Sequence, residues 1–268
     1  MVRAASTRGK FAGAVAGADS IEIKATIPGR QIRVALERFH LTAGNEEERQ
    51  IYFFDTPRLA LLRSGIIVRA RRVVGGAHDC TVKFRPVVPA KIGKKWRKYR
   101  DFKVEADASE SGLVRSASFS MPVAKGLIKR VAGGKAPVAD LYGDEQRAFL
   151  KTMTRRDIDF ASLAVLGPLT AQRWQFADPA CPWPITAELW RRGDGGRLME
   201  VSIRAPVLQT AVAVGGFMAF LAEVGVERDR RPQTKTRWAL DYYIARLARP
   251  QSRKSTAAKA RPTDRRKP

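Results

Sequence analysis

Several short segments of this sequence alternate between apolar and charged residues, and this pattern constrains the fold more than any other feature. In one of them, Arg69 and Arg71 alternate with Val68 and Ala70. Successive side chains of a β-strand point to opposite faces, so such a segment is predicted to be a strand with one apolar and one charged face. Five segments share this design, namely 20–27, 66–74, 80–86, 99–108 and 197–205.

Short turns separate most of these strands, which favours an antiparallel sheet or barrel over βαβ units. Further strands are predicted at 50–54, 155–160, 162–166, 170–176 and 185–191. Helices are predicted at 31–40, 121–131, 144–153, 209–224 and 235–248, with a helical turn at 57–62. The order of strands, helices, strands and helices indicates an α+β chain. Its two sheet halves either close one barrel or form two domains.

The chain is strongly basic, with a formal net charge of +24. Residues 249–268 hold eight Lys or Arg and one Asp, a composition typical of a disordered basic tail or of a nonspecific nucleic-acid contact. The other +17 lies on residues 1–248, so the folded part would itself attract polyanions. We therefore divide the chain into a flexible N-terminus (1–19), a folded domain (20–248) and the tail (249–268).

The sequence also carries signals about location. No apolar run approaches the ~20 residues that span a bilayer, and the N-terminus lacks the apolar core of a signal peptide. The two cysteines, Cys80 and Cys181, have no metal-binding spacing, and so few cysteines suit a reducing compartment. These features predict a cytoplasmic protein without a membrane partner.

The charged strand faces can be interpreted in two ways. Half-buried antiparallel strands normally turn a polar face to water, and paired charges across strands support them modestly. Here the faces are rich in Lys and Arg and poor in Ser, Thr and Gln, as a site that surrounds phosphate requires. Carboxylates, which are oxygen ligands for Mg²⁺ or Mn²⁺, lie among these cations at Glu22, Glu105, Asp107 and Glu200.

One stretch of the sequence resembles the CYTH superfamily, also called the triphosphate tunnel metalloenzymes. The run Tyr52-Phe53-Phe54-Asp55-Thr56-Pro57 is similar to the family's Tyr-Phe-Asp-Thr turn, and Arg69-Ala70-Arg71 is similar to the Arg-x-Arg of its next strand. Thr81-Val82-Lys83-Phe84 and Arg100-Asp101-Phe102-Lys103-Val104 are similar to two strands that follow. The ordered matches end at Val104, and later positions are placed by their order alone.

The resemblance implies a mainly antiparallel eight-stranded β-barrel with flanking helices, around a charged tunnel. Known members of the family include thiamine, inorganic and RNA triphosphatases and the class IV adenylyl cyclases. By resemblance, a triphosphate would be bound by Lys24, Arg69, Arg71, Lys83, Arg173, Lys235 and Arg237. A divalent metal, Mg²⁺ or Mn²⁺, would be held by Glu22 and Glu200 with Asp101 or Glu105.

Three acids of the family's pattern are missing. The family opens with Glu-x-Glu-x-Lys, and Ser20 takes the place of its first glutamate. Lys103 stands where a second glutamate is usual, and Ser202 stands where an acid commonly follows Glu200. A chain that loses anionic ligands but keeps its cations weakens metal binding more than phosphate binding.

Three functions follow from the sequence. The first is a metal-dependent hydrolase of an inorganic or organic triphosphate. The second is a non-catalytic module that binds polyphosphate or a nucleotide and has lost metal ligands. The third is a nucleic-acid-binding protein that uses the basic tail. An adenylyl cyclase is less favoured, because nothing in the sequence marks a purine pocket. Asp55, just before Thr56-Pro57, is interpreted as a turn residue and not as a catalytic one.

Overall fold

Residues 15–109 and 112–248 are described by the computed structural model of the chain. Most of the predicted flexible N-terminus (residues 1–14) and the predicted basic tail (249–268) lie outside the described residues. Both cysteines are free and buried. Within the described ranges, every helix is too short or too polar to cross a lipid bilayer.

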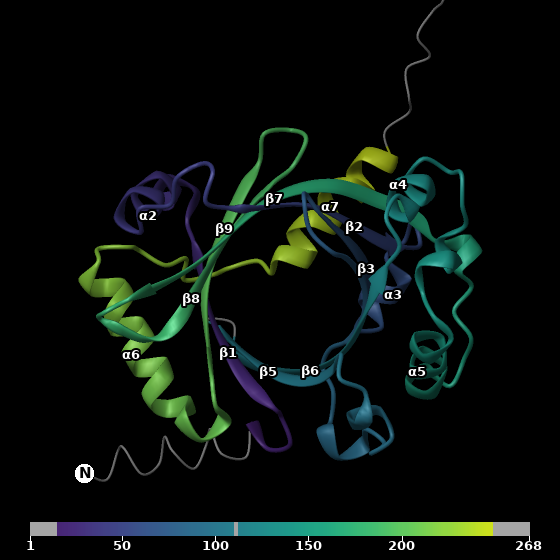
Figure 1. Cartoon of the computed structure of the whole chain (residues 1–268), viewed down its shortest axis with the longest axis horizontal. Helices are drawn as coiled ribbons and strands as arrows, with labels where there is room; N and C mark the ends of the chain where they lie inside the picture. Colours follow the sequence, from purple (N-terminus) through teal and green to yellow (C-terminus); the bar gives the residue numbers. More distant parts are fainter. Residues whose placement is uncertain (1–14, 110–111, 249–268) are drawn as a thin grey trace, which may run out of the picture.

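Nine strands of the described residues form one closed barrel, seen end-on in Figure 1: β1 (Ser20–Ile27), β2 (Glu47–Asp55), β3 (Ile66–Val73), β4 (His78–Phe84), β5 (Phe102–Ser109), β6 (Gly112–Val123), β7 (Ala164–Asp178), β8 (Cys181–Arg191) and β9 (Arg197–Ala205). Their order around the barrel is β1-β5-β6-β4-β3-β2-β7-β8-β9, and β9 closes onto β1. The neighbours pair antiparallel except for β1 and β5, which run parallel. The predicted α+β barrel is confirmed, with nine strands instead of eight and one parallel pair.

The helices lie outside the barrel wall except for α7 (Lys235–Leu247), which crosses one end of the barrel and packs against inward-facing strand residues (Figure 1). The others are α2 (Ile32–Arg38), α3 (Ala60–Arg63), α4 (Leu127–Ala132), α5 (Asp144–Thr154) and α6 (Thr210–Glu223). Short 3-10 helices occur at Gly29–Gln31, Pro89–Lys91, Trp96–Lys98, Val138–Leu141, Phe160–Ser162 and Val207–Gln209. The strands β1–β6 precede α4 and α5 in the sequence, and β7–β9 follow them. Both sets of strands therefore belong to one barrel.

The helix predicted at 121–131 is wrong, because β6 and α4 take its place. Ser118 and Ser120 of β6 line the barrel interior, whereas Ala117 and Phe119 are buried in the outer core. Alternation is therefore present in β6, but its polar positions are serines. A search for charged strand faces misses such a strand.

The strands predicted at 162–166 and 170–176 are one continuous strand, β7, and the segment 155–160 is not a strand. Gly167-Pro168 lies in the middle of β7, and such a pair normally marks a turn. The pairing between β7 and β2 shifts its register at this point. A bulge of this kind tolerates proline within a strand, so the chain continues past it.

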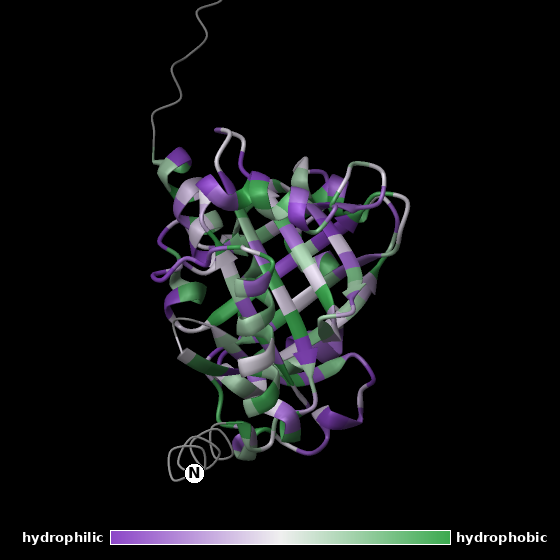
Figure 2. Cartoon of the chain, turned by 90° about the vertical axis from the view of Figure 1, so that its left-hand side faces the viewer, coloured by the Kyte–Doolittle hydropathy of each residue, from purple (hydrophilic) through white to green (hydrophobic). Residues whose placement is uncertain are grey.

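Most apolar side chains of the barrel lie on the outside, where helices cover them, whereas a third cluster that includes Ile51, Phe53 and Trp190 faces the interior and packs against α7. Phe217 and Phe220 of α6 belong to the same buried cluster as Ile23 of β1. The rings of Phe149 in α5 and Phe102 in β5 have centroids 5.1 Å apart. Figure 2 shows hydrophobic and hydrophilic residues following one another along the strands. With the apolar faces packed outward, the alternate side chains of each strand must line the interior.

The turn after β2 is held by a buried carboxylate. One oxygen of Asp55 accepts hydrogen bonds from the backbone N–H groups of Thr56 and Leu61, at 2.7 and 2.9 Å. The other oxygen accepts from the N–H of Leu62 at 2.9 Å, and Thr56 Oγ1 accepts from the N–H of Ala60 at 2.9 Å. The N–H groups of Ala60, Leu61 and Leu62 lie in the first turn of α3, where a helix offers them no partner. Asp55 therefore has the structural role expected from the sequence.

Gly65 allows the chain to enter β3 close to the end of β4. Its φ is +73°, and a Cβ at this position would lie 2.4 Å from the carbonyl oxygen of Arg85. The N–H of Arg85 in turn donates to the Gly65 carbonyl at 2.8 Å. A residue with a side chain would clash here and would also adopt a strained conformation. This close approach helps to fix β3 against β4.

We expect Asp55→Ala to lower the free energy of unfolding by about 3 kcal/mol, because three backbone N–H groups lose a charged acceptor. Urea denaturation measures this change through the transition midpoint. Asp55→Asn keeps one acceptor oxygen and is the matched control, with a loss of about 1 kcal/mol. An unchanged midpoint for Asp55→Ala would show that the turn does not depend on this carboxylate.

Candidate functional site

The interior of the barrel is a cavity of about 630 Å³, which we call the tunnel. Ten basic side chains line it, namely Lys24, Arg49, Arg69, Arg71, Lys83, Arg85, Lys103, Arg173, Arg204 and Lys235. Five carboxylates line it as well, namely Glu22, Glu105, Asp107, Glu188 and Glu200. The charged strand faces therefore point inward, and their interpretation as faces turned to outside solvent is wrong.

The strand register brings opposite charges and like charges side by side across the tunnel wall. Glu22 of β1 pairs with Arg204 of β9 on one side and with Asp107 of β5 on the other. Glu188 of β8 lies directly opposite Glu200 of β9. Directly opposed residues have Cβ atoms about 5 Å apart, so each carboxylate pair needs a cation nearby.

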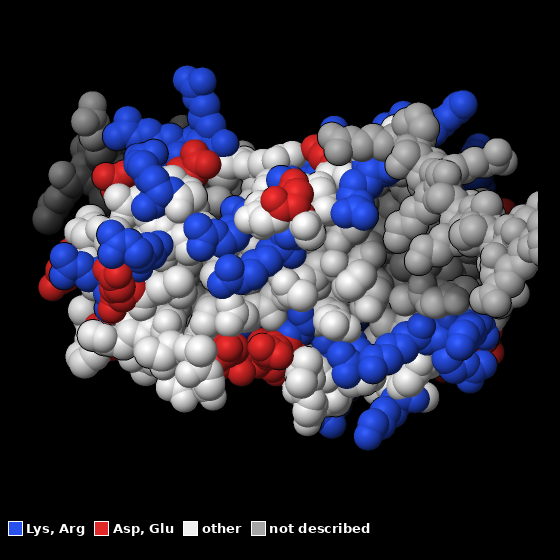
Figure 3. Space-filling view, turned by 90° about the horizontal axis from the view of Figure 1, so that it is seen from above, with Lys and Arg blue, Asp and Glu red and all other residues white. Residues whose placement is uncertain are grey.

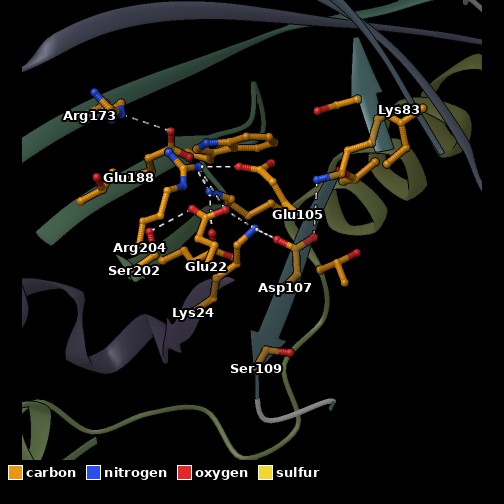
Figure 4. Close-up of a pocket in the computed structure, with 18 of the residues that line it drawn as sticks. Glu22, Lys24, Lys83, Glu105, Asp107, Ser109, Arg173, Glu188, Ser202 and Arg204 are labelled. Carbon is orange, nitrogen blue, oxygen red and sulfur yellow. Dashed lines mark hydrogen bonds and ion pairs between the residues drawn. The ribbon is translucent and has the colours of Figure 1, made fainter. Parts of the chain in front are cut away.

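Asp107 is the centre of one ion cluster, and its side chain is only 1% exposed. Lys24 Nζ lies 2.7 Å from Asp107 Oδ1 and 3.0 Å from Glu22 Oε2, while Lys83 Nζ lies 3.5 Å from Asp107 Oδ2. Figure 4 shows Lys24 reaching Asp107 from the neighbouring strand. Burial opposes ionisation, but Lys24 and Lys83 outweigh it and hold the pKa of Asp107 well below its usual range. Asp107 therefore stays charged and anchors both lysines.

Glu188 is the centre of a second ion cluster, at the α7 side of the tunnel. Its carboxylate contacts Lys235 Nζ, Arg49 Nη1 at 3.1 Å and Arg173 Nε at 3.8 Å. Lys235 Nζ also lies 2.8 Å from Glu200 Oε1. Although burial works against it, the positive charge of Lys235 and Arg49 depresses the pKa of Glu188. One lysine thus joins the two opposed carboxylates.

Other tunnel cations have no such partner. Arg69, Arg85 and Lys103 make no ion pair with any residue that the structure describes. The Nε of Arg69 is buried without a hydrogen-bond partner, and its Nη2 reaches only Thr81 Oγ1, at 3.5 Å. Burial, with the adjacent charge of Arg71, lowers the pKa of Arg69. Burial likewise lowers the pKa of Lys83, and Lys24 adds to this shift. Burial thus disfavours the charged form of both side chains, and a bound anion would favour it.

Most of the predicted site residues meet in the tunnel. The predicted triphosphate-binding residues that line it are Lys24, Arg69, Arg71, Lys83, Arg173 and Lys235, and the predicted metal ligands that line it are Glu22, Glu105 and Glu200. Arg237 does not line it; its side chain is 55% exposed and pairs with Asp241 on α7. Residues two apart on a helix do not share a face, so Arg237 cannot follow Lys235 inward. Asp101 is exposed in the turn before β5, because the strand begins only at Phe102.

Two residues of the Glu188 cluster were not among the predicted site residues. Arg49 lies before the predicted start of its strand at residue 50, but β2 in fact begins at Glu47. Glu188 lies in a strand that was predicted, and Thr186 beside it also lines the tunnel. The alternation of Thr186 and Glu188 with buried neighbours was the signal that could have identified this carboxylate.

The tunnel residues do not fit a bound divalent metal as they are arranged. Each of the five carboxylates has a Lys or Arg of the chain within ion-pair distance. In the described ranges, no group of three or more His, Cys, Asp or Glu side chains is placed to hold a metal ion. Ser202 stands where an acid was expected from the family's pattern, and its Oγ donates to Glu22 Oε1 at 3.2 Å. The predicted Mg²⁺ or Mn²⁺ therefore has no ready ligand set here.

The outer surface near the tunnel is basic as well. A recess of about 430 Å³ shares Lys103, Glu105 and Arg204 with the tunnel and is also lined by Arg97, Lys98 and Arg100. Figure 3 shows one face of the molecule from above, with Lys and Arg spread widely and Asp and Glu in smaller groups. A positive field of this kind concentrates anions near the protein and speeds their entry into a charged cavity.

Comparisons with known proteins bear on the fold. Neither a protein-family model nor a curated protein matches the sequence. Among solved structures, the chain is similar to a candidate adenylate cyclase from Bacillus halodurans, with 14% identity and a TM-score of 0.57 over 82% of this chain and 96% of that one. It is also similar to a candidate adenylyl cyclase from Hippeastrum, with 13% identity and a TM-score of 0.61 over 83% of this chain and 96% of that one. A dominant triphosphatase activity is described for the Hippeastrum protein. At these identities the likeness establishes the fold, and the chain has the barrel fold that its resemblance to the CYTH superfamily implies.

Proposed function

We propose that the tunnel binds a triphosphate or another short phosphate chain. The observation that carries this proposal is the charge of the lining, with ten basic side chains against five carboxylates. The formal excess of five positive charges lies inside a closed barrel, where unpaired charge is costly. A fully ionised triphosphate brings a comparable negative charge on a chain of oxygens that Lys and Arg recognise.

The polar residues between the cations support the same ligand. Thr81, Ser118, Ser120 and Thr186 line the tunnel and offer hydroxyl donors. Arg69 and Arg71 lie on β3, two residues apart, so their guanidinium groups face the same cavity. Planar guanidinium groups bind phosphate oxygens bidentately, whereas lysines act as point charges. The tunnel volume of about 630 Å³ is in the ordinary range for a small-molecule site.

Hydrolysis of the bound triphosphate is a second candidate. The observation that favours it is the fold shared with the Hippeastrum protein, for which a triphosphatase activity is described. The predicted cofactor, Mg²⁺ or Mn²⁺, remains part of this hydrolase hypothesis. Binding is the better supported function, because it requires only the cations already gathered in the tunnel.

We expect Arg69→Ala to weaken tripolyphosphate binding by roughly 10- to 100-fold, because one charge-assisted hydrogen bond contributes about 1.5–3 kcal/mol. Isothermal titration calorimetry in the presence of a chelator measures this loss directly. Arg237→Ala is the matched control: it removes the same charge from outside the tunnel and should change the affinity less than about twofold. Equal losses in both variants would mean that the anion binds the outer surface.

For hydrolysis, we expect phosphate release from tripolyphosphate by the wild-type chain and none by the Arg71→Ala, Lys83→Ala double variant. The assay is run with Mg²⁺, with Mn²⁺ and with a chelator. Release by the wild-type chain only would support a hydrolase in this tunnel. Tight binding without release under all three conditions would reject the hydrolase and leave the binding module.

A further inference from the structure

Lys235 occupies a position that helix electrostatics disfavour. It is the first residue of α7, directly after the N-cap residue Thr234, whose hydroxyl accepts from the N–H of Arg237. The N-terminus of a helix carries partial positive charge, so an acidic side chain is favoured there and a lysine is not. The first turn of α7 holds no acidic residue. Something outside the helix must therefore stabilise this ammonium group.

The stabilising groups are the two opposed carboxylates of the tunnel. Lys235 Nζ contacts Glu188 on β8 and lies 2.8 Å from Glu200 on β9. The side chains are 16%, 18% and 11% exposed for Lys235, Glu188 and Glu200 respectively. The ring of Trp190 lies below the ammonium, with its centroid 5.2 Å from Nζ. Two carboxylates and an aromatic face therefore stabilise the charge.

Glu188 and Glu200 need a cation between them, because Arg49 and Arg173 contact Glu188 but form no ion pair with Glu200 among the described residues. The two residues are direct partners across β8 and β9, where like charges destabilise the sheet. Left without a cation, they would also repel any phosphate chain in the tunnel. A divalent metal would meet both requirements, but so does an ammonium group that α7 brings into the barrel. Lys24 does the same for the other carboxylate pair, Glu22 and Asp107.

We propose that the Lys235 ammonium, and not a divalent metal, is the cation held between Glu188 and Glu200, so that the tunnel binds phosphate chains without Mg²⁺ or Mn²⁺. This inference rests on the proposed phosphate binding, but it concerns a different property of the same site. Mg²⁺ requires near-octahedral oxygen coordination and gives up its water reluctantly. The Lys235 ammonium is part of the chain and already occupies the position between the two carboxylates that a metal ion would need.

The test uses Mn²⁺ alone, without any phosphate, and follows the signal of free Mn²⁺ by electron paramagnetic resonance. We expect no binding to the wild-type chain at Mn²⁺ concentrations up to the millimolar range. Lys235→Ala leaves the two carboxylates without this cation and should gain one Mn²⁺ site, with an affinity at least tenfold above that of the wild-type chain. Lys235→Gln removes the charge with less loss of packing, and it should gain the same site if the alanine variant folds poorly.

Two controls separate this site from a general effect of charge. Lys103→Ala removes a tunnel lysine that has no carboxylate partner in the described residues and should gain no Mn²⁺ site. Lys235→Arg keeps the positive charge and should gain none either. Mn²⁺ binding by the wild-type chain at the strength of Lys235→Ala would overturn the proposal, as would no gain in either neutral variant. Because no phosphate is present, this result is independent of whether the tunnel binds tripolyphosphate.

Discussion

Placing charge inside a closed barrel is the constraint on which the rest of this structure depends. Side chains alternate along each strand, so a charged interior sends the apolar residues of the same strands outward. There they need cover, and α2, α5 and α6 supply it around the wall (Figure 1). The helices are therefore required by the tunnel, since a barrel with this interior would otherwise expose its hydrophobic surface to water.

The charges inside the tunnel are arranged by a simple rule. Each carboxylate lies beside a lysine or arginine of the chain, with Asp107 and Glu188 as the two centres. Buried ion pairs of this kind add little net stability, because their desolvation offsets the attraction between them. The surplus cations, with Arg69 as the clearest case, add a further cost. The phosphate chain that we propose as the ligand would complete this network with its negative charge.

The sequence alone predicted an α+β barrel with a charged interior and most of the cations that line the tunnel. Alternation in β3 and β4 placed Arg69, Arg71 and Lys83 on one face, and closure of the barrel turned that face inward. The prediction failed at β6, where serines replace charges, and at β7, where Gly167-Pro168 resembles a turn. The two failures have different causes: β6 alternates but carries no charges on its inner face, whereas in β7 pairing with the neighbouring strands overrides a local turn signal.

The site residues also differ in how well the sequence alone could place them. Those on regular strands could be predicted, whereas Asp101 could not be excluded without knowing where β5 begins. Arg237 could have been excluded, because the helix was predicted to begin at Lys235, as it does, and residues two apart on a helix do not share a face. The role of Lys235 was beyond sequence reasoning for a different reason. Its partners, Glu188 and Glu200, lie 47 and 35 positions away along the chain and meet it only because the barrel closes under α7. Contacts of this kind come from topology and not from any local motif.

The most direct test of the central claim is a crystal structure of the chain grown with tripolyphosphate and a chelator. The account predicts a phosphate chain inside the barrel, with oxygens bonded to Arg69 and Lys83 and with Lys235 still held by Glu188 and Glu200. A phosphate chain bound only on the outer surface, or an empty tunnel at saturating ligand, would contradict it.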